Sequence, residues 1–218
     1  MIKKRTKSSP LTAILFDFGG VLAEEGFREG LVALAREQGL NDGDIVREGT
    51  QAVYESGFVL GQGTAADFWG LMRNRTGLNG EDEELSKRIL SGFVVRPGMI
   101  SLVKELRAQG YVTGILSDQT CWLDELNERY HFSQAFDRIY NSYFIGKGKQ
   151  DKSLFLDIAA DLKLSSASIL FVDDDEGNID RAKSVGYQVI HYDDEKNFRL
   201  ALERKLSGSE NISTVKMH

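Results

Sequence analysis

The chain has 218 residues, of which 41% are hydrophobic and 28% are charged, and its formal net charge at pH 7 is −6. This length suits one globular α/β domain with a modest insertion, and no apolar run is long enough to cross a bilayer. The acidic balance, with no cluster of lysine and arginine beyond the first residues, argues against nucleic acid as a partner.

The two ends of the chain and its cysteine content give further expectations. Residues 1–11 are basic and polar and residues 207–218 are polar, so we expect a flexible leader and a flexible tail. Cys121 is the single cysteine, which excludes an internal disulfide and suits the reducing cytoplasm. We therefore expect a cytoplasmic protein with no membrane contact.

Five short apolar runs, rich in β-branched residues, predict parallel strands that are buried on both faces. Helical patterns such as "MISLVKELRAQG" and "NIDRAKSVG" alternate with them, and each ends on a glycine that stops the helix. This alternation predicts an α/β fold with a Rossmann-like parallel sheet covered on both sides. The strands are expected at Ala13–Phe16, Val112–Leu116, Arg138–Asn141, Ser168–Val172 and Gln188–His191.

One interval breaks this alternation. Residues 24–94 contain helical patterns but no convincing strand, and they are too many for a simple crossover connection. We expect a helical cap domain inserted after the first strand, above the carboxyl edge of the sheet. The core domain would then comprise residues 12–23 and 95–206.

Acidic residues stand at the ends of several predicted strands. The first strand leads to Asp17, the second to Ser117 and Asp118, and the fourth to Asp173–Asp175. Lys149 lies in a loop ahead of a predicted helix. Ligands of open parallel sheets bind outside the carboxyl ends of the strands, so we expect these side chains to meet in one crevice.

The chemistry of such a crevice is specific. Crowded carboxylates repel one another unless a divalent cation neutralises them, and hard oxygen ligands without histidine or cysteine favour Mg²⁺. A phosphate dianion could then bind, with Lys149 adding a charge and Ser117 a hydrogen bond. Asp17 could attack phosphorus to form an aspartyl-phosphate. Gly19 and Gly20, directly beyond, would let the backbone approach the ion or the substrate closely.

Four motifs, "ILFDFGGVL", "GILSD", "GKGKQDKSLF" and "ILFVDDDEGNIDRAKSVG", resemble in order and spacing those of the haloacid dehalogenase-like hydrolase superfamily. The resemblance covers roughly residues 12–195, and the insertion falls where the branch with a small helical cap carries its cap. It implies a nucleophile at Asp17, a metal contact through the Gly19 carbonyl, and a direct metal ligand at Asp174 supported by Asp173. The candidate site residues are Asp17 and Lys149 for catalysis, Ser117, Gly20 and Asp118 for substrate binding, and Asp17, Gly19, Asp173 and Asp174 for the metal.

Two positions depart from the family pattern. Family phosphatases carry a second Asp, a general acid for the leaving alcohol, where this chain has Gly19; losing such a group costs about 10²–10⁴ in rate. Glu24 and Glu25 are candidate replacements. Asp118 stands where Asn is common, and a carboxylate pointing inward would repel phosphate. We therefore expect it to turn away and cap the next helix.

The sequence favours a Mg²⁺-dependent phosphatase-type hydrolase acting on a small phosphorylated metabolite. Gly19 leaves two alternatives open: a metal-independent 2-haloacid dehalogenase-type enzyme, which lacks that second Asp, and a degenerate protein kept for binding. The substrate and the oligomeric state, monomer or dimer, are not specified by the sequence. Candidates for substrate selection in the cap are Arg28, Phe58, Trp69 and Arg73.

Overall fold

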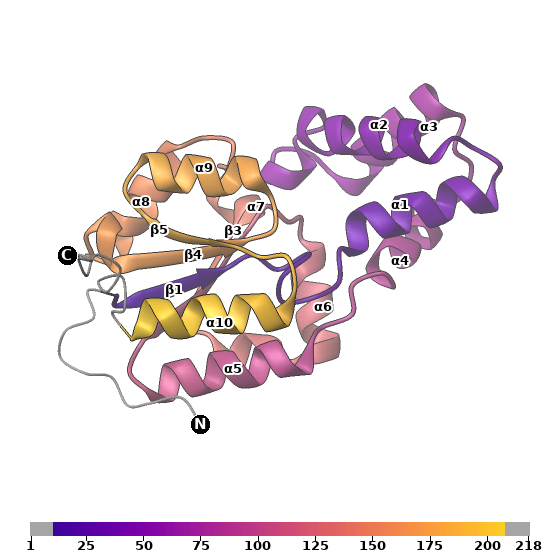
Figure 1. The fold of residues 1–218 in the computed structure, drawn as a ribbon. Coiled ribbons are helices and arrows are strands. Elements are labelled where there is room, and N and C mark those ends of the chain that lie inside the picture. Colours follow the sequence, from indigo (N-terminus) through magenta and orange to yellow (C-terminus); the bar gives the residue numbers. More distant parts are fainter. Residues whose placement is uncertain (1–10, 208–218) are drawn as a thin grey trace, which may run out of the picture.

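A sheet of five parallel strands forms the centre of the structure, a computed structural model that describes residues 11–207 (Figure 1). The strand order is β3-β2-β1-β4-β5, so β1 lies at the centre with β2 and β4 beside it. This confirms the predicted α/β fold with a Rossmann-like parallel sheet. The strands are β1 Ala13–Phe16, β2 Val112–Ser117, β3 Arg138–Asn141, β4 Ile169–Asp173 and β5 Gln188–His191.

The strand ends differ from the expected ones where chemistry is concentrated. Ser117 is the last residue of β2, paired with Asn141 of β3, and Asp173 is the last residue of β4, paired with His191 of β5. Both side chains are therefore held by the sheet itself. Near the N-terminus, Leu11 is fully buried in the core, so the predicted leader, residues 1–11, does not include it. Residues 1–10 of that leader lie outside the described residues.

Alternate residues of β1 face opposite sides of the sheet. Ile14 and Phe16 join the apolar cluster that includes α5, α6 and α10, whereas Ala13 and Leu15 join the cluster with α8 and α9. The sheet is therefore buried on both faces, as parallel sheets are. These helices are α5 Pro97–Ala108, α6 Trp122–Tyr130, α8 Ser153–Asp161, α9 Glu176–Ser184 and α10 Glu195–Leu206.

Residues 26–90, which we name the insertion, form helices that lie beyond the carboxyl ends of the strands (Figure 1). The chain leaves and re-enters the core through two adjacent segments, because Ala23 forms a bridge with Val95 and the Glu24 N–H donates to the Val94 carbonyl. None of the helices within residues 11–207 is both long and apolar enough to cross a membrane. The remaining helices are α1 Gly26–Glu37, α2 Asp42–Glu55, α3 Ala65–Thr76, α4 Asp82–Leu90 and α7 Ser142–Ile145, with short 3₁₀ turns at η1 Phe58–Leu60, η2 Phe132–Ala135 and η3 Ser166–Ser168.

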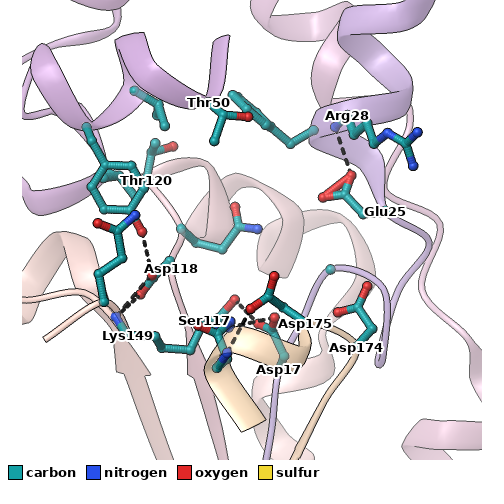
Figure 2. A pocket seen from close by; sticks show the side chains of 18 of the residues that line it. Asp17, Glu25, Arg28, Thr50, Ser117, Asp118, Thr120, Lys149, Asp174 and Asp175 are labelled. Atoms are coloured by element: carbon teal, nitrogen blue, oxygen red, sulfur yellow. Dashed lines mark hydrogen bonds and ion pairs between the residues drawn. The ribbon is translucent and has the colours of Figure 1, made fainter. Parts of the chain in front are cut away.

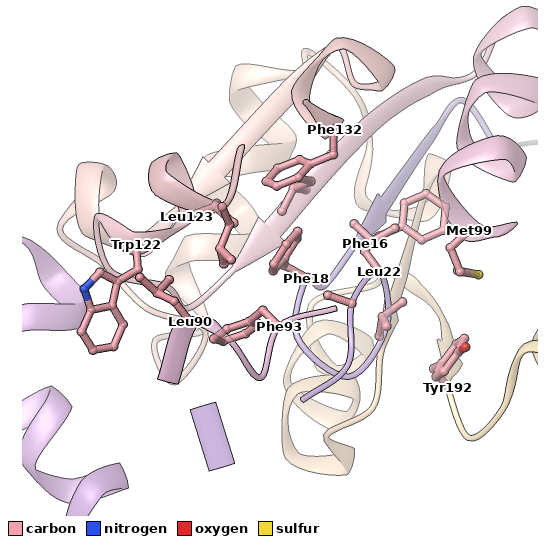
Figure 3. Packing of buried hydrophobic residues seen from close by; sticks show 14 of the residues in the cluster. Phe16, Phe18, Leu22, Leu90, Phe93, Met99, Trp122, Leu123, Phe132 and Tyr192 are labelled. Carbon is pink, nitrogen blue, oxygen red and sulfur yellow. The ribbon is translucent and has the colours of Figure 1, made fainter. Parts of the chain in front are cut away.

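The loop that follows β1 is anchored by aromatic packing. Phe18 is fully buried, and its ring lies 6.0 Å from that of Phe93 and 4.8 Å from that of Phe132 between centroids (Figure 3). Arg96 holds the next part of the loop by donating to the carbonyls of Gly20 and Val21. The backbone beside Asp17 therefore has little freedom to shift.

Candidate active site

A cavity of about 430 Å³ opens between the carboxyl ends of the strands and the insertion. Figure 2 shows Asp17, Ser117 and Asp174 on the core side of it and Thr50, carried by α2, on the opposite side. Lys149 also lines the cavity from the core side. The structure thus brings together residues that the sequence predicts at the ends of three separate strands.

Asp17 lies just beyond the end of β1 and is 9% exposed. Its Oδ1 accepts the Ser117 hydroxyl at 2.5 Å and the Phe18 N–H at 2.7 Å, and its Oδ2 accepts Nζ of Lys149 at 2.7 Å. Burial is the largest influence on the pKa of Asp17 and, with repulsion from Asp173, raises it to about 7 against the pull of Lys149. A buried carboxylate with these donors has a fixed orientation.

Lys149 is buried and bridges two carboxylates. Its Nζ lies 2.7 Å from Oδ2 of Asp17 and 2.7 Å from Oδ2 of Asp173. Burial alone would lower the pKa of Lys149, but Asp17, Asp173 and Asp118 together outweigh burial and raise the pKa above its ordinary value. The ammonium is therefore charged at neutral pH, and it is the cation nearest to the acids.

Three carboxylates fit a divalent cation: oxygens of Asp17, Asp173 and Asp174 all lie within 4.8 Å of one another. They offer only hard oxygen ligands, which suits Mg²⁺. Asp173 is fully buried and accepts Lys149, the Asp175 N–H and the Asn178 amide, so it is held in a supporting position. Asp174 is more exposed, and burial followed by repulsion from Asp173 raises its pKa.

The two glycines after Phe18 have different places. Gly20 has φ +78°, and a Cβ there would lie 2.2 Å from Oδ2 of Asp174, so the missing side chain makes room for that carboxylate. Gly20 is not among the residues that line the cavity, and its role in substrate binding stays a prediction. Gly19 does line it, and an ideal Cβ on Gly19 would lie 3.7 Å from Oε1 of Glu25.

Asp118 does not cap the following helix, so that prediction is wrong. Helix α6 begins after Cys121 without a side-chain cap. The Asp118 carboxylate instead accepts the Tyr54 hydroxyl at 2.5 Å and the Lys149 backbone N–H at 2.9 Å. Its charge is engaged by these donors at the wall of the cavity. Tyr54 is a site residue that the sequence reasoning missed, because its partner lies far away along the chain.

The two glutamates that the sequence predicts as candidate replacement acids have different environments in the structure. Glu24 is exposed and pairs with Arg96, whose hydrogen bond lowers the pKa of that carboxyl. Glu25 lines the cavity, and burial raises its pKa despite the Arg28 N–H that it accepts at the start of α1. Of these two glutamates, Glu25 is the one that lines the cavity.

Of the residues proposed for substrate selection, one lines the cavity. Arg28 stands at its edge, beside Glu25 (Figure 2). Phe58 and Trp69 are buried, and Arg73 donates to the Gly80 carbonyl and to Asp82, away from the cavity. Residues that the sequence reasoning missed come from one face of α2 and its surroundings: Val46, Thr50, Val53 and Tyr54. Their only signal in the sequence is a helical spacing.

Comparisons with known proteins find a curated relative and solved structures of the same fold. Sesquiterpene phosphatase astK of Aspergillus oryzae is 26% identical over 185 residues, which cover 84% of this chain and 90% of that protein. A haloacid dehalogenase-family enzyme from Bacteroides thetaiotaomicron, solved with magnesium and inorganic phosphate, has TM-score 0.66 at 20% identity, covering 86% of this chain and 98% of its own.

A second solved structure has the same fold with a different chemistry. The L-2-haloacid dehalogenase of Xanthobacter autotrophicus, with chloropropionic acid covalently bound, has TM-score 0.61 at 19% identity over 92% of this chain and 84% of its own. At these identities the structural likeness shows the fold alone. The family model for haloacid dehalogenase-like hydrolases matches residues 11–186, so the chain belongs to that family of enzymes, as its motifs predict.

Proposed function

We propose that this hydrolase is a Mg²⁺-dependent phosphatase that cleaves a small phosphate monoester through an aspartyl-phosphate on Asp17. The observation that carries the proposal is the Asp17 carboxylate at the base of the cavity, fixed by Ser117 and Lys149 beside Asp173 and Asp174. The similarity to the fungal sesquiterpene phosphatase supports the same reaction.

The metal would be held by Asp17, Asp174 and the carbonyl of Gly19, with Asp173 in support. Bound Mg²⁺ supplies positive charge that neutralises these carboxylates and attracts the phosphate dianion. Gly20 supports this assignment, because its missing side chain leaves space for Asp174 to face Asp17. The division into a core (residues 12–23 and 95–206) and a cap (residues 24–94) belongs to the same proposal.

The reaction has two displacement steps at phosphorus. An oxygen of Asp17 forms a bond to phosphorus while the ester P–O bond breaks, and the leaving alkoxide takes a proton. Water then attacks phosphorus, loses a proton, and releases inorganic phosphate and free Asp17. Lys149 and Ser117 donate hydrogen bonds to the phosphoryl oxygens and so stabilise their charge.

Glu25 is the proposed proton donor to the leaving alcohol and the proposed base for the water. Its Oε1 lies 3.7 Å from the place where the Cβ of a side chain on residue 19 would stand, and both Glu25 and Gly19 line the cavity. Burial also keeps its carboxyl protonated to a higher pH than that of an exposed glutamate. In this proposal, Glu25 takes the place of the general acid that family phosphatases carry at the position of Gly19.

The acid cluster favours this reaction over dehalogenation. A haloacid carries a carboxylate, which Asp17, Asp173 and Asp174 would repel without a cation. The single positive charge of Lys149 does not neutralise the three carboxylates. The metal-independent dehalogenase therefore fits this cavity less well than the phosphatase.

The test is the release of inorganic phosphate from a panel of alkyl, aryl and acyl phosphates. Wild type and Asp17→Asn are compared, each with Mg²⁺ and with EDTA, and chloride release from 2-chloropropionate is measured in parallel. The proposal expects phosphate release that requires both Asp17 and Mg²⁺. Chloride release in EDTA, without phosphate release from the panel, would overturn it.

A further inference from the structure

One face of helix α2 forms the side of the cavity opposite Asp17. Val46, Thr50, Val53 and Tyr54 all line the cavity, and their spacing places them on adjoining turns of the same helical face. Ile45 and Ala52 pack into the core of the insertion instead. Helix α2 therefore presents Val46 and Val53 to the cavity, while Val53 is also part of the buried core.

The cavity-facing stripe continues into other apolar side chains. Trp122, at the start of α6, and Val59, on η1, are both buried, and the Trp122 ring lies edge-on to Phe58 at 5.2 Å between centroids. Val46 and Phe27 are only partly buried. We name this surface the apolar wall; its members are Phe27, Val46, Val53, Val59 and Trp122.

The hydroxyl groups near the apolar wall already have partners within the protein. The Tyr54 hydroxyl donates to Asp118 at 2.5 Å, and the Thr50 hydroxyl donates to the Val46 carbonyl at 2.9 Å. Glu25, at the N-terminal end of α1, and Arg28, within α1, both line the cavity and stand together at one corner of it (Figure 2). Gln119, Thr120 and Gln150 also line the cavity. A polyhydroxylated group placed against the five apolar side chains themselves would lose water without gaining hydrogen bonds from them.

We propose that the organic group of the substrate is uncharged and apolar, an aliphatic or aromatic alcohol whose carbon skeleton lies against the apolar wall. The proposal rests on the phosphatase function above. The phosphate is at the Asp17 end and the carbon skeleton extends toward α2, so the products are inorganic phosphate and an apolar alcohol. The cavity volume of about 430 Å³ is within the range of small-molecule sites.

The first measurement is kcat/KM for butyl, hexyl and octyl phosphate, compared with glycerol phosphate and a hexose phosphate. We expect about a fourfold rise for each added methylene until the wall is covered, from the free energy of burying one methylene. The two polyhydroxylated substrates should be poorer than hexyl phosphate. The second measurement is the ratio of kcat/KM for octyl phosphate to that for acetyl phosphate, which has no skeleton to reach the wall.

Two variants test whether this ratio depends on the apolar wall. Val46→Asn should lower the ratio at least about tenfold, because the Asn amide would be buried against the alkyl chain of the substrate without a hydrogen-bond partner. Phe27→Asn should act in the same direction, which covers the case in which one variant fails to fold. Leu156→Asn is the matched control, since Leu156 is 51% exposed on α8 and does not line the cavity.

The outcomes separate this proposal from the phosphatase function. A rise with chain length that Val46→Asn or Phe27→Asn abolishes would support it. Equal rates along the series, or preference for the hexose phosphate, with release still dependent on Asp17 and Mg²⁺, would overturn the apolar substrate and leave the phosphatase standing. No phosphate from any substrate would overturn both.

Discussion

The hydroxyl of Tyr54, on α2 of the insertion, donates a 2.5 Å hydrogen bond to Asp118, just beyond β2 in the core. The same carboxylate accepts the backbone N–H of Lys149 at 2.9 Å. Burial and the charge of Asp118 raise the pKa of Tyr54, so the phenol stays neutral and donates. The position of α2 is thereby coupled to the loop that carries the buried lysine.

Tyr54→Phe should therefore lower kcat/KM for phosphate release by about tenfold, because a hydrogen bond to a charged group contributes about 1.5–3 kcal/mol. The matched control is Tyr140→Phe, since Tyr140 donates to Asp161 at 2.6 Å and neither residue lines the cavity. The control should keep the wild-type kcat/KM. Equal losses in the two variants would contradict the coupling.

Glu25→Gln should lower kcat by about 10²-fold with an alkyl phosphate, the effect of losing a general acid. The loss should be much smaller with p-nitrophenyl phosphate, because p-nitrophenolate leaves without a proton. Glu24→Gln serves as the control, since Glu24 is exposed and paired with Arg96. A loss from Glu25→Gln that is independent of the leaving group would indicate a structural role at the start of α1.

A carboxylate on residue 19 should rescue the Glu25→Gln variant. Gly19 does not have a positive φ, and the nearest atom to a Cβ there would be a ring carbon of Phe93 at 3.4 Å, an ordinary contact. Gly19→Asp in the Glu25→Gln background should recover part of the lost kcat with the alkyl phosphate. Absence of any recovery in a folded double variant would argue that position 19 and Glu25 do not serve one reacting group.

Lys149→Met should destabilise the fold as well as inactivate the enzyme. It leaves Asp17 and Asp173 buried without their shared cation, and removing one partner of such a set costs about 3–5 kcal/mol. Burial raises the pKa of Asp17 to about 7 in the folded state, so without Lys149 this carboxyl binds a proton there more readily than in the unfolded chain. The loss of unfolding free energy in Lys149→Met, relative to wild type, should therefore become smaller as pH falls from 7 to 5.

Urea denaturation in EDTA at the two pH values measures this effect. Lys147→Met is the control, because Lys147 pairs with Asp157 at the surface, where such pairs contribute little. Its unfolding free energy should remain close to that of wild type. A deficit for Lys149→Met that is small at pH 7, or that grows on acidification, would be inconsistent with the buried charge set described above.

Mg²⁺ should stabilise the wild type against heat, by about 2.7 kcal/mol at a hundred times its Kd. Asp174→Asn removes one carboxylate of the cluster and should abolish most of the rise in Tm. Asp180→Asn, an exposed position on α9, should retain it. The readout is Tm against Mg²⁺ concentration, which does not require a substrate. A full shift in Asp174→Asn would remove Asp174 from the proposed ligands.

The sequence predicts most of the core because its signals are local. Buried strands of the parallel sheet read as continuous apolar runs, and Asp17 and Asp173 follow from where such runs end. The pairing register shows what the apolar runs cannot. Ser117 pairs with β3 and Asp173 pairs with β5, so these residues are the last members of β2 and β4. The positions of polar side chains at strand ends are thus predictable to within a residue.

Contacts between the insertion and the core are not predictable in the same way. The error at Asp118 arises because its hydroxyl partner, Tyr54, stands on a helix whose packing depends on tertiary contacts. Glu24 and Glu25 are adjacent in sequence, but Glu24 pairs with Arg96, which is distant along the chain, whereas Glu25 accepts the Arg28 N–H at the start of α1. The apolar stripe on α2 has the spacing of a core stripe, so the sequence alone does not show that it lines a cavity.

The central claim is that Asp17 attacks phosphorus. The most direct test is mass spectrometry of the Asp17 peptide after wild-type enzyme is mixed with octyl phosphate or acetyl phosphate and Mg²⁺ and is quenched in acid within one turnover. We expect one added phosphoryl group on Asp17, lost when water completes the turnover and absent from Asp17→Asn. Undiminished phosphate release by Asp17→Asn, with no adduct on the wild-type peptide, would contradict it.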